Sequence, residues 1–67
     1  MTLTKVIEVI GESNKSWDDA VKNAVISALP TVHGITGVHI LNLTGSINEK
    51  GEIYEYKANV NLAYVEN

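Results

Sequence analysis

The stretch from Glu52 to Val65 is the longest run in the chain in which apolar and polar residues alternate. Alternation with a period of two places one row of side chains on each face of a β-strand. Its fourteen residues, at about 3.3 Å each, span roughly 45 Å, which is long for a strand in so small a chain. The remaining residues must cover its apolar row or pair with its edges. The apolar row is Tyr54, Tyr56, Ala58, Val60, Leu62 and Tyr64, and the polar row includes Glu55, Lys57, Asn59 and Asn61.

The size of the chain limits how it can be stabilised. Residues 1–67 are assigned to a single small domain. In such a domain hydrophobic burial roughly cancels the entropy of ordering, so disulfides, metal ions or partner chains are commonly needed. The chain contains no cysteine, which excludes a disulfide and a thiolate metal site. Two sources of stability are left: oligomerisation, or an unusually well packed core between a helix and a sheet.

Charge and hydropathy argue against two classes of partner. The net charge is −3, and the five basic residues are scattered lysines. Nucleic-acid binding typically requires a basic patch, so we expect no nucleic-acid partner. No apolar run has the length of a transmembrane helix, and the N-terminus lacks the apolar region of a signal peptide. We therefore expect no membrane partner and a cytoplasmic location.

A strand and a helix are predicted first in the chain. Residues 3–11 are rich in β-branched residues, which favours a strand, and both of its faces are largely apolar, which hints at assembly. Residues 16–30 predict a helix: Ser16 and Asp19 resemble a capping box, and Pro30 ends the helix near Leu29. Its apolar stripe is Trp17, Ala20, Val21, Ala24, Val25 and Ala28.

A hairpin is predicted to follow. Residues 38–48 and 52–65 form its strands, and Asn48–Gly51 fits a type I turn. This turn sets a register with Val38 opposite Leu62, Ile40 opposite Val60, Leu43 opposite Lys57 and Thr44 opposite Tyr56. One face then carries Val38, Ile40, Ala58, Val60 and Leu62 beneath the helix, and the other carries His39, Leu41, Leu43, Lys57, Asn59 and Asn61.

These elements define an α+β fold of β-α-β-β order, with a three-stranded antiparallel sheet packed on one helix. The helix, at roughly 20–25 Å, is about half as long as the last strand. We therefore expect the sheet to extend past the helix and to meet a partner chain there.

Three stretches resemble those of the dodecins, a family of small β-α-β-β proteins that assemble into hollow homododecamers. They are KVIEVIGES (Lys5–Ser13), SWDDAVKNAV (Ser16–Val25) and IYEYKANVNLAY (Ile53–Tyr64). The resemblance spans residues 5–65 and lies in the order of the elements rather than in one motif. It implies that the main partner is the chain itself, in a homododecamer.

The resemblance also implies a ligand site. Known dodecins mostly bind flavins such as FMN or riboflavin between subunits and are thought to store or buffer them. Flavin-binding members stack a tryptophan of the second strand on the flavin ring and hydrogen-bond its polar edge with a glutamine of the third strand. Those positions align with Gly37 and Lys57, and neither matches. The chain is more similar to members that lack both residues and are calcium-associated and flavin-free. The implied site residues are Gly37, Val38, His39 and Lys57.

The candidate binding residues have alternative interpretations. His39 could contact the ligand or lie in a subunit interface. His33 follows the helix, where a positively charged side chain interacts favourably with the helix dipole. Lys57 could meet a phosphate or flavin edge, or pair with Glu55 or Glu8 across a subunit contact. Carboxylates are the oxygen ligands that calcium prefers, but no EF-hand spacing is present, so a calcium site would form between subunits and its residues are unknown. The candidate carboxylates are Glu8, Glu12, Asp18, Asp19, Glu49, Glu52 and Glu55.

The sequence contains no recognisable catalytic motif. It lacks a nucleophile elbow, a glycine-rich phosphate loop and a cysteine nucleophile, so we expect a protein that is not an enzyme. The first hypothesis is a dodecin-like homo-oligomer that binds a small ligand of the flavin class. The alternatives are a flavin-free shell with a structural or calcium-binding role, and a small interaction module that pairs through the edge of its long strand.

Overall fold

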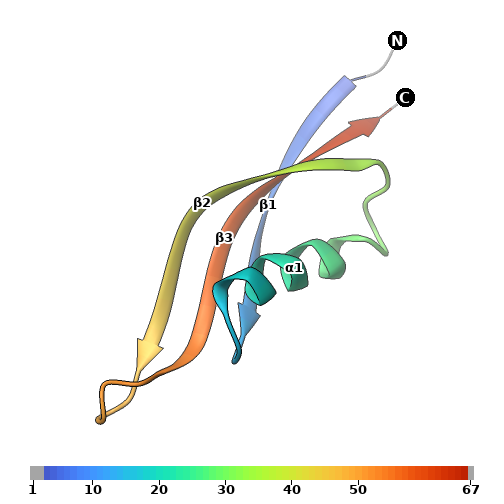
Figure 1. Ribbon diagram of the computed structural model, residues 1–67. Coiled ribbons are helices and arrows are strands. Elements are labelled where there is room, and N and C mark those ends of the chain that lie inside the picture. The colour runs from blue at the N-terminus through green and yellow to red at the C-terminus, as the bar shows by residue number, and fades with distance from the viewer. Residues whose placement is uncertain (1–2, 67) are drawn as a thin grey trace.

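The fold is a curved antiparallel sheet with one helix on one of its faces (Figure 1). The computed structural model describes residues 3–66. The elements are β1 (Leu3–Ser13), α1 (Trp17–Ala28), β2 (Ile35–Ile47) and β3 (Ile53–Glu66). The strand order is β1-β3-β2, with both pairs antiparallel. The predicted fold class is confirmed, and the long alternating strand lies at the centre of the sheet, paired along both edges.

The helix begins where the sequence indicates a cap. Ser16 has extended backbone angles, and its hydroxyl accepts a hydrogen bond from the Asp19 backbone N–H at 3.0 Å. The buried Ser13 hydroxyl donates to the Asp19 carboxylate at 2.7 Å and accepts the backbone N–H of Lys15 at 2.9 Å. Asn23 ties the helix to β1 by donating to the Glu12 carbonyl at 2.8 Å. These bonds fix the helix entrance against the end of β1.

The predicted helix, residues 16–30, is too long at both ends. Ser16 is the cap rather than the first helical residue, and Leu29 closes the other end. The backbone N–H groups of Thr31 and Val32 both donate to the Ala28 carbonyl, at 3.1 and 2.9 Å. Pro30 has no N–H to continue the helical pattern. Gly34 then adopts a positive φ of 77° as the chain turns into β2.

The predicted strand bounds also need correction. β1 continues past residue 11, because Glu12 and Ser13 still pair with Lys57 and Tyr56 of the long central strand. β2 begins at Ile35 rather than Val38, so Gly37 lies inside the strand, opposite Ala63, and β2 ends at Ile47 rather than 48. β3 is shifted by one residue, from 52–65 to 53–66. Gly11 and Gly37 both lie within strands, because the neighbouring residues of β3 continue to pair beside them.

The core is small and is built mainly of alanine and valine. Val21 and Val25 of α1 and Ile7 and Val9 of β1 pack against it while partly buried. Gly11 of β1 lets the helix come close: a Cβ atom at this position would lie 2.0 Å from the Ala20 carbonyl oxygen and 2.8 Å from the Ala24 Cβ. The buried hydrophobic residues are Ala20, Ala24, Ala28, Ala58, Val60 and Leu62.

The hairpin register is correct near the start of β2 and wrong further along. Val38 pairs with Leu62 and Ile40 with Val60, as predicted. An irregularity between Ile40 and Asn42 then adds one residue to β2, which shifts the pairs from Asn42 to Ser46 and moves side chains to the opposite face. Leu43 therefore opposes Ala58 rather than Lys57, and lies on the helix side instead of the other face. Thr44 opposes Lys57 rather than Tyr56. A second irregularity between Ser46 and Ile47 restores the predicted register, with Ile47 opposite Ile53.

The helix covers only part of its side of the sheet. α1 packs against β1 and β3, so the β2 residues expected beneath it are poorly covered: Val38 and Ile40 remain 48% and 45% exposed. The chain measures 54 × 20 × 13 Å, with a radius of gyration of 13.8 Å, whereas a compact chain of this length has about 11 Å. The expected extension of the sheet past its helix is confirmed.

The Gly11 contact gives a first prediction. Gly11→Ala places a methyl group against the helix backbone, and we expect it to lower the free energy of unfolding by about 2–3 kcal/mol. Gly37→Ala is the matched control, because its Cβ would lie 3.9 Å from its nearest neighbour, Ala63. Urea unfolding at one fixed protein concentration measures both. Equal stability of the two variants would contradict the close packing of α1 on β1.

Candidate functional site

The sheet face turned away from α1, called the open face below, gathers most of the polar side chains of the strands. Residues directly opposite in a sheet share a face, so the pairing gives rows that cross all three strands. One row is Glu8, Asn61 and His39, and another is Glu12, Lys57 and Thr44. Between them, Asn59 lies opposite both Ile10 and Asn42. The open face therefore has a polar centre of carboxamide, imidazole, ammonium and carboxylate groups.

Three of the four predicted site residues lie on this face. Gly37 and His39 are neighbours near the start of β2, opposite Ala63 and Asn61. Lys57 lies on the same face but six residues from Ala63 along β3, which corresponds to about 20 Å. Val38 points to the other side, opposite the buried Leu62. A single chain therefore groups Gly37 with His39 and leaves Lys57 apart.

Lys57 forms an ion pair with Glu55 of its own chain, whereas the prediction places this pair across a subunit contact. The Lys57 Nζ lies 3.7 Å from Glu55 Oε1, and the two side chains are 44% and 37% exposed. An ion pair this accessible to water contributes between zero and about 1 kcal/mol. Glu8, the other predicted partner, lies in a different row, opposite Asn61. The Lys57 ammonium is therefore weakly held and can rearrange towards an incoming anionic or carbonyl group.

The chemistry of the open face suits hydrogen bonding rather than ring stacking. Asn42, Asn59 and Asn61 each carry a donor and an acceptor, while Gly37 has no side chain to stack on a ring. Val6 and Ile10, both 58% exposed, add apolar area along β1. The open face can therefore hold a small polar molecule, or an apolar one if a second subunit closes over it.

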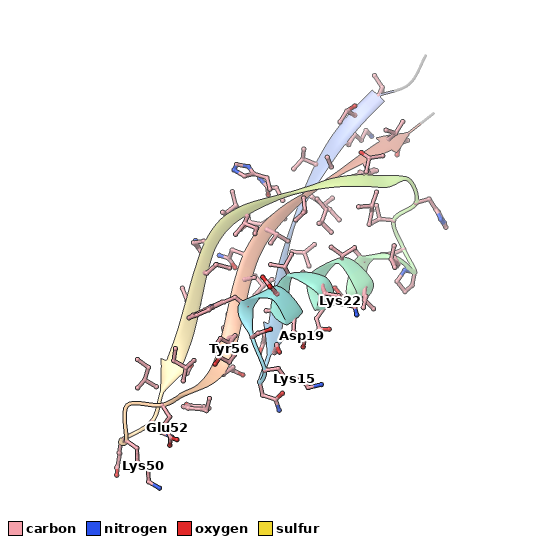
Figure 2. All side chains as sticks on the ribbon, viewed as in Figure 1. Lys15, Asp19, Lys22, Lys50, Glu52 and Tyr56 are labelled. Carbon is pink, nitrogen blue, oxygen red and sulfur yellow. The ribbon has the colours of Figure 1, made fainter. Side chains whose placement is uncertain are left out.

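The described residues, 3–66, contain no group of three or more His, Cys, Asp or Glu side chains placed to hold a metal ion. The candidate carboxylates are spread over β1, α1 and the hairpin instead. Figure 2 shows Glu52 at the hairpin end, far from Asp19 at the start of the helix. A calcium site formed between subunits therefore stays a prediction.

Trp17 has a role that the sequence did not reveal. Its indole N–H donates to the Thr44 carbonyl at 2.8 Å, and its ring meets that of Tyr56 edge to face, with centroids 4.8 Å apart. Through these two contacts Trp17 joins the start of α1 to Tyr56 on β3 and to Thr44 on β2. The sequence predicts only that Trp17 belongs to the apolar stripe of the helix, because a contact between residues 27 positions apart leaves no local signal.

A shallow groove of about 380 Å³ lies between the α1–β2 connection and the end of β3. His33 lines this groove, and the caps at the helix end come from backbone N–H groups rather than from His33. Lys5 and Glu66 form a 2.8 Å ion pair beside it, and the hydrogen bond to the Glu66 carboxylate raises the pKa of Lys5. The groove is formed by segments far apart in sequence and was not predicted. Its lining residues are Thr31, Val32, His33, Tyr64, Val65 and Glu66.

Comparison with known proteins places the chain in a family. The sequence model of the dodecin family matches residues 3–66, and the chain belongs to this family. Among curated proteins no sequence matches significantly. No helix among residues 3–66 is long and apolar enough to cross a membrane.

Solved dodecin structures match the whole fold. Dodecin from Streptomyces coelicolor is 26% identical, with a TM-score of 0.90 over 98% of this chain and 93% of that one. Dodecin from Streptomyces davaonensis is 20% identical, with a TM-score of 0.90 over 98% and 96%. The calcium dodecin of Mycobacterium tuberculosis is 27% identical, with a TM-score of 0.78 over 92% and 87%.

The site geometry gives a second prediction: a contact of the helix start contributes to folding stability, whereas a side chain of the open face does not. Trp17→Phe keeps a ring beside Tyr56 but removes the bond to Thr44, so we expect it to cost about 1 kcal/mol of unfolding free energy. Lys57→Ala removes an exposed, weak ion pair and should change stability by less than about 0.5 kcal/mol. Urea unfolding followed by far-UV circular dichroism compares them. A larger loss in Lys57→Ala would show that the open face is needed for folding.

Proposed function

We propose that the chain is the subunit of a hollow dodecin-type homododecamer that binds a small ligand. The observation behind assembly is how much surface the subunit leaves uncovered, together with the apolar side chains exposed on it. Its accessible surface is 4746 Å², whereas a compact monomer of this mass exposes about 4,200 Å². Exposed apolar side chains lie on both sides of the sheet, including Val6 and Ile10 on the open face and Val38, Ile40 and Leu43 on the helix side.

The ligand of this assembly is a flavin such as FMN or riboflavin, held at a subunit contact on the open face. Family membership supports this assignment. Gly37, Val38, His39 and Lys57 align with the family's flavin site, and all of them except Val38 lie on the open face. Because Lys57 lies about 20 Å from Gly37 within one chain, a site using both draws them from different subunits. His39, Lys57 and the neighbouring carboxamides then supply the polar contacts, and the protein stores or buffers its ligand in the cytoplasm without catalysing a reaction.

A second candidate function is a flavin-free shell with a structural or calcium-binding role. Gly37 favours it, because glycine provides no stacking surface where flavin-binding members carry tryptophan. The 27% identical relative from Mycobacterium tuberculosis is a calcium dodecin with its own calcium-binding site. In this chain calcium would sit between subunits, where carboxylates such as Glu8 and Glu12 from two copies could meet.

Native mass spectrometry of the untreated protein tests the assembly and its content together. The expected result is one species with the mass of twelve subunits, accompanied by a small molecule in fixed ratio to the subunits. A bound flavin supports the first function, whereas bound calcium without flavin supports the second. A monomer would contradict both.

A substitution at Gly37 tests the position of the flavin site. An aromatic ring stacked on the flavin is worth about 0.5–1.5 kcal/mol, so Gly37→Trp on two facing subunits should tighten FMN binding by roughly 5- to 150-fold. Quenching of FMN fluorescence measures the affinity. Gly37→Leu, which adds apolar bulk without a ring, is the control. Equal affinities for wild type and Gly37→Trp would contradict a flavin site at this position. If wild type does not quench FMN at micromolar concentration, flavin binding is contradicted and the flavin-free shell is the remaining candidate function.

A further inference from the structure

The open face carries more negative than positive charge. Glu8 and Glu12 of β1 lie in its two polar rows. Residues two apart on a strand share a face, which adds Glu55 beside Lys57 on β3. The described strand residues thus place three carboxylates and one ammonium group on this face, together with the imidazole of His39. The excess of carboxylates agrees with the net charge of −3 on the whole chain.

The other four lysines lie elsewhere in the subunit. Figure 2 shows Lys15 and Lys22 near the helix and Lys50 at the end of the hairpin. Lys5 lies on the helix side of the sheet, where its ammonium is engaged in a 2.8 Å ion pair. In the described part of the chain, a ligand on the open face therefore meets no ammonium group other than that of Lys57.

The positive charge of Lys57 is already offset by carboxylates. Its Nζ lies 3.7 Å from Glu55 Oε1, and Glu12 stands directly opposite it in the sheet. Residues directly opposite have Cβ atoms about 4.5–5.5 Å apart. The ammonium can donate a hydrogen bond to an uncharged carbonyl, but a phosphate that approaches it also approaches both carboxylates. Lys57 therefore favours a neutral acceptor over a doubly charged one.

The charges of Glu8 and Glu12 are not neutralised by the rest of the described chain. Both residues are exposed, and neither carboxylate forms an ion pair with another residue among 3–66. Glu8 shares a row with His39, two strands away, and Glu12 shares a row with Lys57, one strand away. A ligand beside His39 or Lys57 therefore lies within about 10 Å of an unpaired carboxylate. That separation is about one Debye length at roughly 0.1 M salt, so the repulsion is felt.

We propose that these carboxylates make the open face select an uncharged flavin, riboflavin, over its phosphorylated form, FMN. The inference rests on the proposed flavin function and names the ligand within that class. The two molecules share the ring and differ by one phosphate, which carries a charge of about −1.5 to −2 at neutral pH. Assembly strengthens the effect, because each further copy whose open face meets the site brings the same excess of carboxylates. Glu8 and Glu12 are the residues that set the selectivity.

Titration of the protein with riboflavin and with FMN, followed by quenching of flavin fluorescence, tests the selectivity. The buffer has low ionic strength and a pH of about 8, where histidine is ordinarily uncharged, and a chelator keeps divalent cations from the carboxylates. We expect riboflavin to bind roughly four- to fifteenfold more tightly than FMN, from the Coulomb repulsion between the phosphate and one or two carboxylates about 10 Å away in water. In about 1 M salt the Debye length is about 3 Å, and the two affinities should agree within about twofold.

The double variant Glu8→Gln, Glu12→Gln assigns the selectivity to these two residues. Glutamine keeps the size of the side chain and removes its charge. FMN should therefore bind roughly four- to fifteenfold more tightly than it binds wild type, while the affinity for riboflavin stays within about twofold. Glu49→Gln, in the hairpin turn, is the matched control and should change neither affinity. Circular dichroism checks that each variant is folded.

Two results would overturn the inference and leave flavin binding in place. One is FMN binding at low salt that is as tight as riboflavin binding. The other is a preference for riboflavin that the double variant retains in full. Quenching of neither flavin would contradict the proposed flavin function itself, and this inference with it.

Discussion

The structure depends on a mismatch of length between one helix and one strand. The helix has 12 residues and the central strand 14, but a helix rises about 1.5 Å per residue and a strand about 3.3 Å. The helix therefore spans less than half the length of the sheet. A single helix is also too narrow to cover three strands. It packs against β1 and β3 and leaves β2 uncovered. Apolar side chains outside this cover stay exposed to water unless another chain packs against them.

Close packing of small residues makes the limited cover sufficient to fold the chain. Ala20, Ala24 and Ala28 form the inner side of the helix, and Gly11 removes the last obstacle between helix and β1. The small side chains bring the backbones of α1 and β1 close together. They also bury little apolar area, because alanine has a small side chain. A core of six small and medium side chains provides modest stability, and the proposed assembly with other copies would supply the remainder. The polar open face, which the helix never contacts, is then available for a ligand.

The fold could be read from the sequence because its signals are local. The alternation of Glu52–Val65, the Ser16 cap, Pro30 and the Asn48–Gly51 turn each act over a few residues and each was found in place. The extra residue at Leu41 was not predicted, because a bulge in β2 depends on the strand beside it. That single residue moved Leu43 to the helix side and placed Thr44 opposite Lys57. The bond from Trp17 to Thr44 was missed for the same reason.

The candidate site was predictable only in part. Its residues were named from the family resemblance, and the strand register then grouped Gly37 with His39 but separated Lys57. No pattern within one chain could give their final neighbours, since these belong to other subunits in the proposed assembly. The groove beside His33 lay equally outside prediction, because it joins the α1–β2 connection to the end of β3.

The central claim is that contact with other copies completes the stability of this subunit. Thermal unfolding over a range of protein concentrations tests it most directly, since association that favours the folded state makes the melting temperature depend on concentration. Over about a hundredfold dilution, the account predicts a melting temperature that falls steadily as the protein is diluted. A constant melting temperature, together with a monomeric mass at every concentration, would contradict it.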